Sequence, residues 1–187
     1  MRRSWSSASR TGDAIRHRAV YGAAAALLLS LSACSLIGSP DLQYETDYAN
    51  HEPLHVFGYP STGSLQVVQE VVWRIADGKA GDLEKLATSD STDSETRKTA
   101  ANWIKSFQKG AKGKVAADFY DEASERQVVV LYFQDTHQVK EIDVRLDGLA
   151  GEDGWQVLMN ETSLKEATGA PTWAPKEPGG NGSVSTG

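Results

Sequence analysis

The stretch VVVLYF at residues 128–133 consists entirely of β-branched, aliphatic and aromatic residues. Such a run is typical of a central β-strand that is covered on both faces. Three further segments, 115–120, 141–146 and 155–160, alternate between two sets of side chains, which is the period of a strand. The sequence therefore predicts four strands between residues 115 and 160.

The links between these strands are short and rich in turn-forming residues. They lie at residues 121–125, 135–137 and 148–154. Parallel neighbours would need a crossover of a dozen or more residues, whereas antiparallel neighbours can be joined by a few. We therefore expect an antiparallel meander.

Upstream of the strands, apolar residues recur at helical spacing. One helix is predicted over residues 64–77, and a short helical turn over 82–87. A third helix begins at Thr92 and Glu95, which fit a capping box, and ends near Gly110. Helices gathered before an antiparallel sheet indicate the α+β class. We expect N-terminal helices packed on a curved four-stranded antiparallel sheet.

The N-terminal segment, residues 1–33, has the organisation of a signal peptide. Five arginines precede AVYGAAAALLLSL at residues 19–31, a run of 13 residues without a charge. A membrane-spanning helix needs about 20 apolar residues, so this run has the length of a signal-peptide core instead. Arg2 and Arg3 leave twin-arginine export open beside the general secretory route.

The apolar run ends in Leu31-Ser32-Ala33-Cys34, and Cys34 is the only cysteine of the chain. These residues resemble the lipobox of bacterial lipoproteins. The resemblance implies that the Cys34 thiol receives a diacylglyceryl group and that cleavage makes Cys34 the new N-terminus. Acyl chains such as palmitate would then hold the protein on the extracytoplasmic face of the bacterial cell membrane, since two or more chains give a stable anchor.

Composition excludes several classes of protein. The chain of 187 residues has a net charge of −6, which becomes −10 once residues 1–33, with five Arg and one Asp, are removed. An acidic body argues against nucleic-acid binding and against attachment through anionic lipids. Because Cys34 is the only cysteine, the chain can form no internal disulfide.

The mature chain divides into three parts. Residues 34–60 contain several Pro and Gly residues and little periodicity, so we expect a tether, with an apolar cluster near 54–59 that could pack on the domain edge. The α+β domain spans 61–163. Residues 164–187, which are rich in Pro, Gly, Ser and Thr from Thr168 onward, are expected to form a disordered C-terminal tail.

The order of helices followed by a meander resembles cystatin-like α+β folds, in particular nuclear transport factor two-like domains. In that family, helices close a curved sheet into a cone with an internal cavity. The resemblance covers about residues 61–163 and includes the final strand preceded by Glu152-Asp153-Gly154-Trp155. The fold hosts enzymes and binding modules alike, so it does not choose between them.

Enzymes of that superfamily place carboxylates, His or Tyr inside the cone. The candidates here are Asp118 and Tyr120, which share a face of one predicted strand. A buried carboxylate could act as a proton-transfer base. The alternative is that Val115, Ala117 and Phe119 form the buried face and Asp118 points to solvent.

The sequence contains no Gly-rich phosphate loop and no paired clusters of metal ligands. His51 and His55 have a helical ligand spacing, but Pro53 between them opposes a helix. We therefore expect no cofactor and no metal.

Large aromatic residues could line a cone cavity or fill the core; they are Trp73, Trp103, Phe107, Tyr132 and Trp155. The leading hypothesis is a lipid-anchored envelope protein that binds a partner protein or a small apolar ligand without catalysis. The alternative is a cone-cavity enzyme of the isomerase or dehydratase type that uses Asp118.

Overall fold

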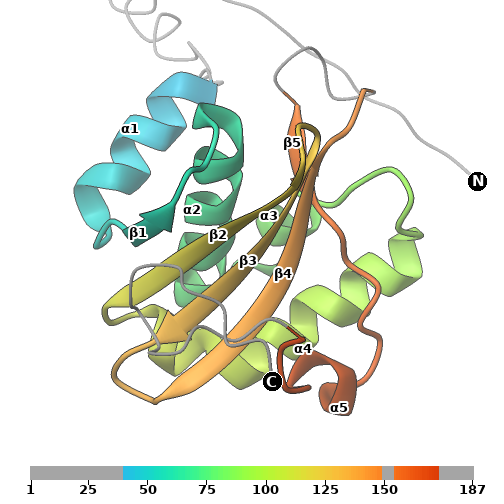
Figure 1. Ribbon diagram of the computed structural model, residues 1–187. Helices are drawn as coiled ribbons and strands as arrows, with labels where there is room; N and C mark the ends of the chain where they lie inside the picture. The colour runs from blue at the N-terminus through green and yellow to red at the C-terminus, as the bar shows by residue number, and fades with distance from the viewer. Residues whose placement is uncertain (1–39, 149–153, 173–187) are drawn as a thin grey trace, which may run out of the picture. The chain divides into compact units, whose positions relative to one another are not determined.

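Two amphipathic helices, α2 (Thr62–Asp77) and α4 (Asp93–Ala111), pack together on one face of a β-sheet. The computed structural model describes residues 40–148 and 154–172, which belong to one unit of the chain. Figure 1 shows α2, the short helix α3 (Ala80–Glu84) and α4 behind the sheet. The chain therefore has the α+β architecture predicted from the helical and alternating patterns.

The sheet has five strands in the order β1-β2-β3-β4-β5. Strands β2 (Val115–Ala123), β3 (Arg126–Phe133), β4 (Gln138–Leu146) and β5 (Trp155–Val157) form the expected antiparallel meander. Strand β1 (His55–Gly58) pairs with β2 in parallel. The prediction of a four-stranded antiparallel sheet is thus wrong, because the sheet is mixed and has one more strand at the β2 edge.

Strand β1 is too short for its period to be visible in the sequence, and its end depends on a close approach to β2. Gly58 adopts φ of 83°, and a Cβ atom built on it would lie 2.2 Å from the carbonyl oxygen of Phe119. No residue with a side chain fits there without a shift of one of the two strands. Gly58 therefore lets the chain leave the sheet tightly against β2.

Helix α1 (Pro40–Asn50) also lies inside the segment 34–60 that was expected to be a tether. A buried ion pair between Asp47 and Arg74 of α2 holds this helix in place. The ring centroids of Tyr44 and Tyr48 also lie 5.5 and 5.9 Å from the ring centroid of Trp73 in α2. Residues 40–50 and 55–58 are therefore helix and strand rather than irregular chain. The helix α1 could not be predicted from its polar composition, because its contacts with α2 are made by aromatic rings and one carboxylate.

The helix ends follow local chemistry. Ser61 caps α2 by accepting a hydrogen bond from the Ser64 N–H, and Gly78 ends that helix at φ of 72°. The predicted capping box of Thr92 and Glu95 is present at the start of α4. A second capping box begins the short helix α5 (Leu164–Ala167), which falls within the segment 164–187 that was expected to be disordered; residues 173–187 lie outside the described ranges.

The two faces of the sheet carry different sets of side chains. On the face toward α2 and α4, Val129, Leu131 and Phe133 of β3 belong to the main core, where the rings of Phe107 and Phe133 stack with centroids 5.2 Å apart. The opposite face, called here the second face, carries a separate apolar cluster of Tyr120, Val128, Val130 and Val139. The two faces therefore carry alternate residues of each strand, as the strand period requires.

Trp103 should be a principal contributor to stability, because it is 1% exposed at the centre of the helix-side core. We predict that Trp103→Ala lowers the free energy of unfolding by about 3–5 kcal/mol, the usual cost of a large aromatic lost from a core. The matched control is Tyr59→Ala, since Tyr59 is 87% exposed and such a change costs less than about 0.5 kcal/mol. Urea unfolding measures both, and equal midpoints would contradict the assignment of Trp103 to the core.

Candidate functional site

Asp118 and Tyr120 lie together on the second face of the sheet, away from α2 and α4. In the sheet register, Asp118 pairs with Val130 of β3 and with Phe57 of β1. Asp118 is 1% exposed, so it does not point to solvent. Its Oδ1 atom accepts no hydrogen bond within the described part of the chain.

Burial changes the titration of both groups. Loss of hydration raises the pKa of the Asp118 carboxyl from 3.8 to about 6. Burial also raises the pKa of Tyr120, and the charge of Asp118 adds to that shift. A carboxyl with this pKa could exchange a proton near neutral pH. Neither of the two pockets described below includes Asp118, however, so no described hollow brings a substrate to it.

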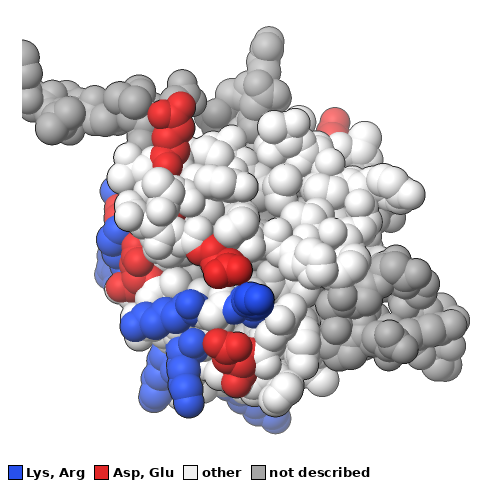
Figure 2. Space-filling view, turned by 90° about the vertical axis from the view of Figure 1, so that its left-hand side faces the viewer, with Lys and Arg blue, Asp and Glu red and all other residues white. Residues whose placement is uncertain are grey.

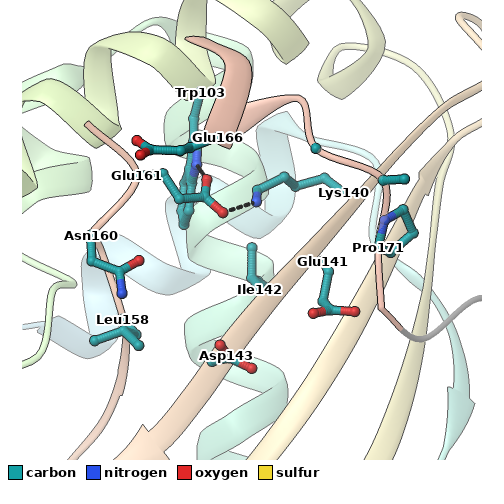
Figure 3. Close-up of a pocket in the computed structure, with 12 residues that line it drawn as sticks. Trp103, Lys140, Glu141, Ile142, Asp143, Leu158, Asn160, Glu161, Glu166 and Pro171 are labelled. Carbon is teal, nitrogen blue, oxygen red and sulfur yellow. Dashed lines mark hydrogen bonds and ion pairs between the residues drawn. The ribbon is translucent and has the colours of Figure 1, made fainter. Parts of the chain in front are cut away.

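A polar pocket of about 100 Å³ opens between β4, the segment that follows β5, and α5 (Figure 3). Its centre is an ion pair between Lys140 Nζ and Glu161 Oε1, 2.5 Å apart. The Trp103 indole N–H donates to Glu161 Oε2 at 2.5 Å, and Lys140 Nζ lies 5.2 Å from the centroid of the Trp103 ring. Glu161 thus neutralises an ammonium group whose side chain is only 4% exposed.

The pocket has little capacity for chemistry or for a small ligand. Ligand pockets usually enclose about 300–1,000 Å³ and are mostly apolar, whereas this one is smaller and is bordered by the carboxylates of Glu141, Asp143 and Glu166. The Lys140 ammonium is already paired. Among the residues that the structure describes, no group of three or more His, Cys, Asp or Glu is placed to hold a metal ion.

A second hollow of about 260 Å³ is wide open to solvent at the opposite end of β4. It is bordered by Arg126 and by Arg145, which forms an ion pair with Asp90. The Ser89 N–H donates to Asp147 Oδ2 at 2.7 Å along the same rim. The hydrogen bond and the ion pair fix the loop after α3 against β4.

The five aromatic residues considered as cavity lining do not converge on one site. Phe107 belongs to the helix-side core, Trp73 is buried against the rings of Tyr44 and Tyr48, and Trp103 reaches the polar pocket. Tyr132 lies on the second face, where its hydroxyl is 2.9 Å from His137 Nδ1. Trp155 packs at the edge of the core on β5. Trp73 and Phe107 are both buried, each 1% exposed.

Lys140 and Glu161 were missed by sequence reasoning, although one signal was present. Lys140 has the same parity in β4 as Ile142 and Val144, which are buried in the helix-side core. A lysine at a core position of a strand requires a carboxylate nearby. The position of Glu161, in an irregular segment 21 residues further on, gave no such signal.

The surface around α1 and β1 is the third notable region. These elements lie at the left of Figure 1, and that side faces the viewer in Figure 2. Figure 2 shows the charged residues gathered toward the left and bottom of the view, with a broad uncharged area beside them. The N-terminal elements also contribute two exposed tyrosines, Tyr48 at 51% and Tyr59 at 87%.

The lipobox residues, with Cys34 and the apolar run 19–31, lie outside the described residues, and their role stays a prediction. Across the described ranges, no helix combines the length and apolarity needed to cross a bilayer. No protein-family model, no curated protein and no solved structure matches the chain.

Asp118 should make stability depend on pH in a specific direction. Its folded pKa of about 6 lies above the ordinary 3.8, so the folded state keeps a proton that the unfolded state releases. The free energy of unfolding therefore falls as the pH rises from about 4 to 6. We predict that Asp118→Asn removes this fall and stabilises the protein at pH 7 by about 1–3 kcal/mol.

Urea unfolding at several pH values measures this effect, and the exposed Asp135→Asn variant is the control. A parallel pH dependence in wild type and Asp118→Asn would show that the Asp118 carboxyl is solvated.

The ion pair in the polar pocket gives a further prediction. Glu161→Gln leaves the Lys140 ammonium buried without a counter-charge, which should lower the free energy of unfolding by about 2–3 kcal/mol. Adding Lys140→Met to Glu161→Gln should recover part of that loss. Asp82→Asn, which breaks an ion pair with the 76%-exposed Lys85 side chain, should cost less than about 1 kcal/mol. Equal effects of Glu161→Gln and Asp82→Asn would contradict the buried pairing.

Proposed function

We propose that this chain is a lipid-anchored extracytoplasmic protein of a bacterial cell envelope, whose α+β domain binds a partner protein without catalysis. The anchor rests on the lipobox Leu31-Ser32-Ala33-Cys34 at the end of a short apolar run. The binding role rests on one observation, the surface around α1 and β1, which presents the exposed rings of Tyr48 and Tyr59.

We further propose that the domain is a cystatin-like cone with two additions. The helices α2, α3 and α4 precede the meander β2–β5 and pack on one of its faces, as in that architecture. Helix α1 and strand β1 extend the sheet at the β2 edge. The apolar side chains between helices and sheet belong to one continuous core, which supports a binding role over a reaction inside the cone.

The exposed tyrosines favour a protein as the partner. Tyr48 and Tyr59 present large rings and hydroxyls at the surface, and tyrosine is enriched at protein interfaces because it supplies area at a low entropy cost. A small apolar ligand is less well supported, since the described pockets are polar and the deeper one is small.

The position of this face in the sequence indicates where the partner lies. Helix α1 begins at Pro40, so five residues separate Cys34 from the fold. A spacer of that length extends over about 20 Å at most. An anchored domain would therefore meet proteins that are in the membrane or close to its surface.

The anchor is tested by Cys34→Ala. Because no other segment is expected to hold the protein to lipid, the variant should be found soluble or unprocessed after cell fractionation, whereas wild type should be found processed and with the membranes. A Cys34→Ala protein that is processed and still sediments with membranes would contradict the proposal.

Binding is tested by a photo-crosslinking amino acid placed at Tyr59 in the full chain inside cells. We expect one discrete adduct that weakens when Tyr48 is replaced by Ser. The same probe at Lys85, which is also exposed, is the matched control. Equal adducts at both positions, or an adduct that ignores Tyr48→Ser, would show that the face around α1 is not the interface.

A cone-cavity enzyme of the isomerase or dehydratase type is the second candidate. The observation that favours it is the buried Asp118 with its pKa of about 6 beside Tyr120. Loss of a proton-exchange activity in Asp118→Asn, with the fold intact by circular dichroism, would support this candidate. The position of Asp118 on the face away from the helices favours the binding role.

A further inference from the structure

Helix α4 has one face in the core and, directly opposite, a row of exposed lysines. Trp103 marks the face that is buried in the helix-side core. Lys98, Lys105 and the C-cap residue Lys112 follow one another at intervals of seven residues, which is almost two helical turns, and Lys109 falls on the same side. All four lysines are exposed. We call them the lysine stripe, which extends along α4 for about 21 Å.

The stripe belongs to a basic part of an otherwise acidic protein. Residues 93–114 contain six of the 14 Lys and Arg residues of the mature chain and only two of its 24 Asp and Glu residues. Their net charge is therefore +4, whereas the rest of the mature chain has a net charge of −14. The two acidic residues lie in the first turn of α4, where Glu95 is part of the capping box. The overall charge of −10 thus averages over two unlike parts.

The ammonium groups of the stripe are not neutralised by ion pairs. Five other Lys or Arg residues form ion pairs with carboxylates, but none of the stripe lysines does so within the described ranges. The helix dipole favours cations in the last turn of a helix, which accounts for Lys109 and Lys112 but not for Lys98 and Lys105. A row of unpaired charges on a helix attracts an anionic surface that runs along it.

The path of the chain from the proposed anchor leads to the helix layer that carries the stripe. Five residues separate Cys34 from α1, and they extend over about 20 Å at most. Helix α1 is joined to α2 by the ion pair between Asp47 and Arg74, and α2 packs against α4. Figure 1 shows α2, α3 and α4 together behind the sheet. An anchor on lipid would therefore hold this layer of helices close to the headgroups.

We propose that the lysine stripe of α4 lies on the anionic phospholipid headgroups of the membrane that holds Cys34, an inference that rests on the proposed lipid anchor. The acyl chains attach the protein, and the stripe determines which side of the domain faces the bilayer. The sheet, on the other side of the helix layer, is then directed away from the membrane. Lipid phosphates are suitable partners because lysine ammonium groups donate charge-assisted hydrogen bonds to them.

Lysine labelling of the lipidated mature protein on vesicles tests the proposal. The vesicles consist of phosphatidylcholine alone or of an equal mixture with phosphatidylglycerol, and mass spectrometry follows acylation by a water-soluble reagent. We expect Lys98 and Lys105 to react several-fold more slowly on the anionic vesicles. The difference should disappear in 1 M salt, where charges are screened beyond about 3 Å. Equal rates on both lipids, whether fast or slow, would overturn the proposal.

A pair of variants separates the stripe from the net charge of the protein. Lys98→Gln combined with Lys105→Gln should raise the labelling rate of Lys109 on anionic vesicles toward its rate on neutral vesicles. The matched control is Lys79→Gln combined with Lys85→Gln, which removes the same charge from side chains that are 50% and 76% exposed. In this control Lys109 should stay protected. An equal rise in both double variants would overturn the proposal.

Flotation with neutral vesicles reports the anchor separately, because it depends on the acyl chains and not on lipid charge. A protein that fails to float there, but binds anionic vesicles through Lys98 and Lys105, would contradict the anchor and support the stripe. An acidic protein is the alternative partner of the stripe. If the stripe lysines were protected in native membranes but reacted equally on both kinds of vesicle, that protein would be the partner and the proposal would be overturned.

Discussion

The requirement that both faces of β3 be covered determines the arrangement of the other elements. Its side chains are apolar in both directions, with Val129, Leu131 and Phe133 on one face and Val128 and Val130 on the other. A strand of this kind is stable only between two layers, because each exposed face would leave apolar area in water. Helices α2 and α4 supply one layer, and the second face requires another.

Two buried charges attach the outlying segments to this framework. Arg74 of α2 is neutralised by Asp47, which brings α1 against the helix layer, and Lys140 of β4 is neutralised by Glu161, which holds the segment after β5 over the sheet edge. A buried ion pair is weak evidence for net stability, but an unpaired buried charge is costly. Each basic group therefore selects one position for a segment that has few apolar residues of its own.

Elements whose apolar side chains recur at a regular period could be predicted from the sequence, and elements without such a period could not. The helix over 64–77, the capping box of Thr92 and Glu95, and the meander β2–β5 follow from period and local hydrogen bonding, and the structure confirms them. Helix α1 and strand β1 were missed because their stability comes from single contacts with distant residues. Asp47 reaches Arg74, and Gly58 lies against Phe119.

The same distinction applies to the candidate sites. The parity of β2 places Asp118 and Tyr120 on one face, as predicted, but parity cannot show whether that face is covered. Asp118 is 1% exposed, and no local pattern in the sequence indicates this burial. The pairing of Glu161 with Lys140 could not be predicted for the same reason, since Lys140 lies on another element and the segment that contains Glu161 has no periodic pattern.

The parallel pairing of β1 with β2 has a consequence for biogenesis. His55 pairs with Ala116, so the first strand of the sheet has no partner until the three helices between them and the beginning of β2 have emerged. Contacts that are this far apart in sequence form late, because chain closure precedes any gain from pairing. During synthesis, β1 would therefore keep its backbone N–H and C=O groups unpaired until late, and the sheet would form only after the helices that precede β2.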